Sequence, residues 1–193
     1  VIQLFVGRRA LTLSAIAEPA LMLAIFTVAI TAGSTDLSQI CRSTQSATWR
    51  LLNPAHVLAF AAMFVVLLAE TGRIPVDNPA THLELTMVHE AMLLEYSGRF
   101  LALMEWGASI KQLVLMTLLA NVFVPVGLAV SEAGPGALAL SLLAYLAKLL
   151  ALAAAVVLVE TTNAKLRLFR VPDLLSAAFV LATLALLSTF LFQ

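Results

Sequence analysis

The polar residues between Glu70 and Arg99 are the ones whose types and spacing could do chemistry. They are concentrated in a chain whose composition is otherwise 62% hydrophobic. Charged groups at the edge of a membrane are costly to desolvate, so such a cluster indicates a buried polar cavity or a docking surface, not a lipid-facing anchor. The carboxylates are Glu70, Asp77, Glu84, Glu90 and Glu95, and the bases are Arg73, Arg99, His82 and His89.

Two prolines divide this polar stretch. Pro75 and Pro79 prevent a continuous helix, so we expect Thr71–Ala80 to form an ordered turn after an apolar span. The residues that follow, Leu83–Met104, have the apolar spacing of an amphipathic helix at the membrane interface, and we expect this helix to run into the next span.

On that interfacial helix, Glu95 and Arg99 lie one turn apart and can pair, with Glu84 roughly above them. His89 and Tyr96 lie on a different side. A solvated face held together by ion pairs is the simpler interpretation, but the many carboxylates against few bases favour burial or a protein partner.

Two further charges lie inside apolar runs. Glu18 precedes Pro19, which cannot donate to the Ala15 carbonyl, so carboxyl and backbone polarity coincide at one depth. Lys148 lies equally deep and needs a carboxylate partner, a depressed pKa or a wet cavity. Packing against a neighbouring helix for Glu18, and snorkelling for Lys148, are the structural alternatives. We favour an ion pathway for both, whereas a helix contact and a kink account for Asn121 and Pro125.

The elements that must position these groups are membrane helices. The mean hydropathy is +1.01 and only 11% of residues are charged, which is typical of a bilayer protein. We predict an all-α polytopic bundle of five spans plus the interfacial helix. We also expect one integral membrane domain over residues 1–193, N-terminally incomplete because it begins at Val1 in apolar sequence. The predicted spans are Ala10–Ala32, Leu51–Ala69, Leu113–Val130, Ala137–Val159 and Leu174–Phe192.

Basic residues sort between alternate loops. One side holds Arg8, Arg9, Arg73, Arg99, Lys111, Lys165, Arg167 and Arg170, and the other holds only Arg42 and Arg50. The positive-inside rule therefore predicts that the Glu70–Lys111 region faces the cytoplasm and that the loops at Gly33–Arg50 and Ser131–Gly136 face outward. The balanced charge makes nucleic acid an unlikely partner. The single cysteine, Cys41, allows no intrachain disulfide, and no Cys/His spacing suggests a zinc or iron–sulfur site.

The motif Ala69-Glu-Thr-Gly-Arg73 with Pro75 and Asp77, followed by Glu95-Tyr-Ser-Gly98, resembles the signature of the complex I subunit 1 family of respiratory enzymes. Val76 stands where quinone-reducing members have Phe. The segment His82–Glu95 and the loop Lys165–Asp173 are more similar to membrane subunits of group 4 nickel–iron hydrogenases. Glu18 and Lys148 align with charges in helices of the same family, so the resemblance covers nearly the whole chain.

This resemblance implies a helical subunit beneath a peripheral redox arm. Hydrogenase large and small subunits would hold the nickel–iron centre and the iron–sulfur clusters, antiporter-like membrane subunits would be neighbours, and this chain would bind no cofactor. The junction with the arm would be lined by Glu70, Arg73, Asp77, Glu84, Glu90, Glu95 and Arg99, with Pro75, His89 and Tyr96 in the same loop and cavity. The candidates for the ion pathway would be Glu18, Lys148, Glu70, Glu84, Glu90 and Glu95.

The function that this implies is that of a coupling and anchoring subunit of a membrane-bound hydrogenase of the formate hydrogenlyase type, in the cytoplasmic membrane. Three alternatives remain open: a quinone-site subunit of an NADH:quinone oxidoreductase, the only one in which quinone binds; a freestanding proton or cation transporter; and a structural anchor that moves no ions. The substitutions Glu18→Gln and Lys148→Met would discriminate between ion movement and anchoring.

Overall fold

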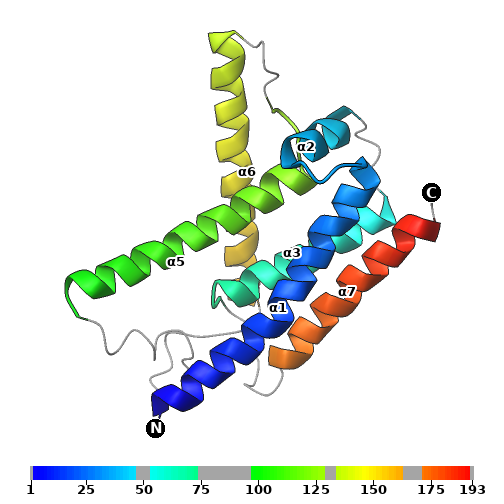
Figure 1. Ribbon diagram of the computed structural model, residues 1–193. Coiled ribbons are helices and arrows are strands. Elements are labelled where there is room, and N and C mark those ends of the chain that lie inside the picture. Colours follow the sequence, from blue (N-terminus) through cyan, green and yellow to red (C-terminus); the bar gives the residue numbers. More distant parts are fainter. Residues whose placement is uncertain (1, 47–52, 74–96, 129–133, 163–170, 192–193) are drawn as a thin grey trace.

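Every regular element of the described residues is helical. The computed structural model describes residues 2–46, 53–73, 97–128, 134–162 and 171–191 (Figure 1). This confirms the predicted all-α polytopic bundle. In chain order the helices are α1 (Ile2–Ala32), α2 (Leu37–Ser46), α3 (Pro54–Glu70), α5 (Arg99–Leu118), the π-helix η2 (Leu119–Phe123), α6 (Pro135–Thr162) and α7 (Val171–Leu191).

Four stretches of helix in the described part of the chain are long and apolar enough to cross a membrane. They are Ala15–Ala32 of α1, Arg99–Phe123 of α5 and η2, Pro135–Thr162 of α6 and Val171–Leu191 of α7. Helix α3 corresponds to the predicted second span but has 17 residues, which is short for a bilayer of about 30 Å. Each predicted span thus coincides with a helix, while the number that cross stays a prediction.

The third span differs from its predicted bounds. It begins at Arg99 instead of Leu113. Gly98, the residue before it, has a positive φ of 57°, which lies outside the helical range. It ends at Phe123 instead of Val130. The final residues of the predicted interfacial helix, from Arg99 onward, therefore belong to α5. The part of that helix within residues 74–96 lies outside the described residues.

Helices α1, α3 and α7 pack side by side along their lengths (Figure 1). Alanines recur every three or four residues on the buried face of each helix, and small side chains of this kind let helix backbones approach closely in a membrane. The fully buried alanines are Ala17, Ala20 and Ala24 in α1, Ala55, Ala59 and Ala62 in α3, and Ala178, Ala182 and Ala185 in α7.

Helix α6 is packed very differently. Only 6% of the residues in its most apolar window are buried, and Figure 1 shows its first half extending past the other helices. Many of its leucines are exposed, Leu140 and Leu150 most of all. Its polar contacts with the rest of the chain lie at Tyr145, Lys148 and Glu160, and one side of its second half, including Leu152 and Val156, packs against the core.

The two ends of α3 are defined by local signals. At its start, Asn53 Oδ1 accepts a hydrogen bond from the Ala55 amide at 3.3 Å, and Pro54 occupies the first turn, where a missing N–H does no harm. At its end, Gly72 adopts a φ of 61° and the Arg73 amide bonds back to the Leu68 carbonyl. This stop places Arg73 just beyond the helix.

The loop between the first two predicted spans contains a short helix that the sequence did not indicate. In α2, Asp36 caps the amino end by accepting from the Ser38 amide at 3.0 Å. Ile40 and Thr44 are buried and lie one turn apart, so they mark the face of α2 that packs against the rest of the chain. Helix α2 lies beside η2, as Figure 1 also shows.

Candidate functional site

Glu70 and Arg73 join the end of α3 to α5 and α6. Lys111 of α5 forms an ion pair with Glu70. Arg73 donates from Nη2 to Gln112 Oε1 at 2.9 Å, and its Nη1 lies 3.6 Å from Glu160 Oε1. The two motif residues therefore lie where three helices meet, directly before residue 74. Opposite charges are thus held together where the chain leaves α3 and enters the loop predicted from the signature motif. We call this cluster the charged corner.

Three members of this cluster were missed in the sequence. Lys111 and Gln112 lie on α5 outside the motif, and Glu160 closes the long apolar run of α6. The one available signal was Glu160, a lone carboxylate at the end of an apolar span, which needs either solvent or a base. Its partner could not be predicted from sequence spacing, because Arg73 follows α3 and lies far from Glu160 along the chain.

Most of the predicted loop residues lie outside the described residues. These are Pro75, Asp77, Glu84, His89, Glu90, Glu95 and Tyr96, together with His82. Arg99 is the exception. It is the first residue of α5, it is exposed, and its guanidinium carbon lies 5.0 Å from the centre of the Phe100 ring. The predicted pairing of Arg99 with Glu95 therefore stays a prediction.

Glu18 lies on an exposed face of α1, next to Pro19 inside the helix. Among the described side chains it makes no ion pair or hydrogen bond, and none joins it to Lys148. An exposed carboxylate on an apolar helix requires water or a partner from outside the described residues. The structure therefore places Glu18 and Lys148 as two separate polar positions.

The second polar position is a break in the third span. Helix α5 widens into the π-turn η2, and Val124 then leaves helical geometry with φ −129° and ψ 67°. Pro125 follows. Because proline has no N–H, it cannot donate to the Asn121 carbonyl four residues earlier. Pro125 thus lies beyond the end of the helix. The sequence had predicted a kink within the span at this residue. Backbone carbonyls are left without helical donors at this end.

Side chains from three other helices supply the missing donors. The Cys41 thiol of α2 donates to the Asn121 carbonyl at 3.2 Å. His56 of α3 bonds through Nε2 to the Phe123 carbonyl at 2.8 Å, so this nitrogen carries the proton. Lys148 of α6 donates to the Val124 carbonyl at 2.9 Å. We call Cys41, His56 and Lys148 the carbonyl clamp.

Lys148 has a partner that the sequence analysis did not consider. Among the described residues its ammonium bonds to no carboxylate; it caps the carboxyl end of the α5–η2 helix, where the helix dipole is negative. Tyr145, one turn earlier on α6, shares a hydrogen bond of 2.8 Å with Thr117 of α5. One contact with a charged group and one neutral contact therefore join α6 to the α5–η2 helix and its end.

The backbone beyond the break also approaches α6 closely. Gly127 has a φ of 77°, and a Cβ placed on it would lie 2.8 Å from the Ala144 Cβ. Only glycine fits both requirements. Gln45 of α2 donates to the Leu128 carbonyl at 3.2 Å. The chain after η2 is thus held between α2 and α6, within reach of Lys148.

Burial affects the chemistry of the clamp thiol. Desolvation raises the pKa of Cys41 above its usual range, and the nearby Lys148 ammonium partly opposes this shift. The neutral thiol is therefore the favoured form, which agrees with its role as a hydrogen-bond donor. Within the described residues no group of three or more His, Cys, Asp or Glu side chains could hold a metal ion.

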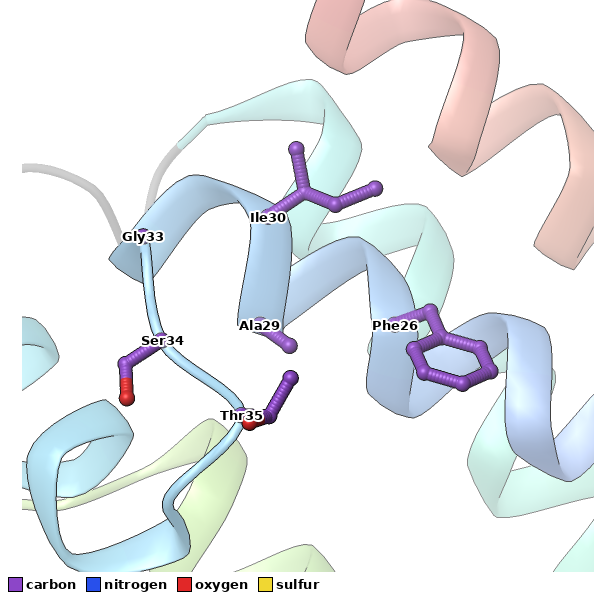
Figure 2. Close-up of a pocket in the computed structure, with 6 residues that line it drawn as sticks. All are labelled: Phe26, Ala29, Ile30, Gly33, Ser34 and Thr35. Atoms are coloured by element: carbon purple, nitrogen blue, oxygen red, sulfur yellow. The ribbon is translucent and has the colours of Figure 1, made fainter.

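A shallow cavity of about 500 Å³ lies at the far end of α1. Figure 2 shows Phe26, Ala29 and Ile30 on the last turns of the helix, with Ser34 and Thr35 on the turn that follows Gly33. None of the described residues that line it is ionisable, and most of them are apolar.

The fold, the charged corner at Glu70 and Arg73 and the charges on apolar helices define a polytopic membrane protein with polar sites between its helices. The family model described as NADH dehydrogenase matches residues 3–191, and the chain belongs to this family. This agrees with the resemblance that the signature motif indicates.

Curated relatives narrow the similarity within the family. The chain is 34% identical to "Formate hydrogenlyase subunit 4" of Escherichia coli (strain K12) over 177 residues, 91% of this chain and 56% of that protein. It is 35% identical to "Hydrogenase-4 component C" of the same strain over 178 residues, 92% of this chain and 54% of that protein. The chain thus spans about half the length of the curated relatives it matches.

Proposed function

We propose that this chain is a coupling and anchoring subunit of a multisubunit membrane-bound hydrogenase, of the formate hydrogenlyase type. It would link redox chemistry in a peripheral arm to the movement of protons or sodium ions. Partner large and small subunits would carry the nickel–iron centre and the iron–sulfur clusters, and antiporter-like subunits would lie beside it. The observation that supports this most is the similarity to two hydrogenase components over nine-tenths of the chain.

The charged corner supports the anchoring part of the proposal. Arg73 and Glu70 connect three helices at the start of the signature loop. A movement of that loop, or a change in its charge, would therefore act directly on α5 and α6. In the proposed orientation this corner faces the cytoplasm in the inner membrane, where the redox arm would dock. Asp77, Glu84, Glu90 and Glu95 would complete the junction.

The ion pathway is the other part of the proposal. Glu18 and Lys148 would exchange or repel ions within the membrane, in one integral domain. An exposed carboxylate on α1 is consistent with a pathway lined by other helices or subunits. Lys148 is already committed to a backbone carbonyl, so its part would be electrostatic control of the path, with ammonium charge as the active property.

A quinone-site subunit of an NADH:quinone oxidoreductase is the second candidate. The family model that matches the chain carries the description NADH dehydrogenase. In that case the signature loop would form the quinone site. The departure at Val76 favours the hydrogenase proposal over this one.

The deciding experiment is the metal and cofactor content of the complex that copurifies with the tagged full-length protein from its native membrane. Nickel together with iron supports the hydrogenase proposal. Iron and flavin with quinone reductase activity, and no nickel, overturns it in favour of the second candidate. In the assembled complex, ion movement that persists in both Glu18→Gln and Lys148→Met would remove the proposed ion pathway.

A further inference from the structure

The π-turn Leu119–Phe123 depends on groups outside its own helix. A π-turn is a rare, weakly preferred form of backbone and occurs mostly as a single turn inside an α-helix, often at functional sites. Here the carbonyls at its end are bonded by Cys41, His56 and Lys148, which belong to α2, α3 and α6. The form of the turn is therefore set by tertiary contacts.

The three clamp residues differ in how freely they can leave. The His56 ring is buried and packs against Phe123, with 5.4 Å between ring centres, so it moves with α3. Cys41 has a short side chain on a packed helix. Lys148 has a long flexible side chain on α6, the least buried of the spans. The contact to the Val124 carbonyl is the one that can open without moving a helix.

An unpaired polar atom next to the clamp indicates a second arrangement. Asn121 Oδ1 is buried and has no hydrogen-bond partner among the described residues. Burial removes such an atom from water and no hydrogen bond replaces the lost hydration, so the free energy of the present form is raised. A rotation of residues 119–124 would change what this oxygen faces and could give it a partner.

We propose that Leu119–Phe123 is a joint that keeps its wide-turn form while the Lys148 ammonium holds the Val124 carbonyl, and that withdrawal of the ammonium lets the turn rewind toward α-helical register. Cys41 and His56 are positioning residues that hold the adjoining carbonyls. A shift of register by one residue rotates the residues concerned by roughly 100° about the helix axis, which would carry Asn121 to a new face. Any link between this joint and ion movement rests on the proposed function, but the joint itself does not.

The test is amide hydrogen exchange of the peptide Leu115–Leu128 in the full-length protein, within its native complex and without turnover. Lys148→Met removes a charge-assisted hydrogen bond to a carbonyl at the break. Because the hydrogen bonds of the turn must break each time it changes register, more frequent rewinding should make exchange in this peptide about tenfold faster. Lys148→Arg keeps a cation at the carbonyl and should exchange like the native protein.

Two controls make the result decisive. Ser141→Ala alters α6 two turns before Lys148, at a hydroxyl that bonds only within its own helix, and should leave exchange unchanged. If Lys148→Met does not assemble, Cys41→Ala should raise exchange in the same peptide, and Cys41→Ser, which keeps a donor, should not. Native exchange rates in Lys148→Met, or in Cys41→Ala, would overturn the joint.

This experiment is independent of the proposed function. A complex without nickel whose Leu115–Leu128 amides respond to Lys148→Met would refute the hydrogenase proposal and retain the joint. A nickel-containing complex whose amides do not respond would do the reverse.

Discussion

The helices of this chain fall into two regions that are stabilised by different means. In α1, α3 and α7, stripes of buried alanine bring the backbones together, and no Asp, Glu, Lys or Arg is buried among the described side chains of these helices. In α5, η2 and α6, many large apolar side chains are exposed, and only a smaller set, including Phe123 and Val156, packs into the core. Hydrogen bonds and an ion pair add contacts at a few positions. The first region is a closely packed frame. The second has more exposed apolar surface, and its polar contacts involve single side chains that can be substituted separately.

This difference predicts where a single substitution has its largest effect. Ala182 is fully buried between helices, so Ala182→Leu overpacks the frame and should destabilise it by about 3 kcal/mol, enough to prevent assembly. Leu150→Ala on the open face of α6 should be nearly neutral. The measurement is thermal stability of the purified complex. Equal effects of the two substitutions would contradict the division into two regions.

The next largest effect is expected at Gly127, where the backbone after η2 approaches α6 closely. Gly127→Ala meets Ala144 at 2.8 Å and places a side chain at a positive φ, so we expect a loss of about 1–2 kcal/mol. Adding Ala144→Gly to the Gly127→Ala variant removes the steric clash and leaves only the free-energy cost of a side chain at positive φ. Thermal unfolding of the two variants separates the contributions. A double variant no more stable than the single one would show that the contact is not tight.

A smaller effect is expected at the charged corner. The Lys111 side chain is 52% exposed and that of Glu70 only 11%, so solvent screens their pair on one side. A double-mutant cycle of Glu70→Gln and Lys111→Met should give a coupling of about 0.5 kcal/mol that shrinks as salt is raised. A coupling that ignores salt would indicate that the pair is buried by residues 74–96 or by a partner.

The smallest predicted effect is a pH dependence at Cys41. Its pKa is raised in the folded protein, so folding favours the neutral thiol. Stability from this group is fully present below the pKa of the unfolded thiol and is lost as pH rises through the higher folded pKa. Maleimide labelling of Cys41, followed by peptide mass spectrometry, should be slower than that of free cysteine at pH 8 and still be rising above pH 9. A rate that levels off by pH 8 would contradict the raised pKa.

Much of the first region was predictable from the sequence. Apolar length located every helix of the frame, and Gly72 and Asn53 are standard end signals that bracket α3. The motif also identified Glu70 and Arg73 before their contacts were known. These features are local, so spacing along the chain is sufficient to find them.

The second region was predictable only in part. Lys148 was singled out because of its depth in an apolar run, but its partner is a carbonyl that exists as a free acceptor only because the helix breaks at Val124. Backbone acceptors leave no trace in residue type. Pro125 and Gly127 were the available signals, and together they mark a helix end better than a kink. Helix α2 was missed because ten residues with few apolar side chains look like a loop.

The π-turn also has a consequence for how relatives of this chain should be aligned. A turn closed by a bond from residue i to i+5 holds one residue more than an α-turn. A homologue that lacks one residue between Leu118 and Pro125 would therefore keep its hydropathy and its overall identity. Yet its lysine at the position of Lys148 would face a different carbonyl, or none. We therefore expect the length of this short interval, as well as the lysine itself, to decide whether a homologue keeps this contact.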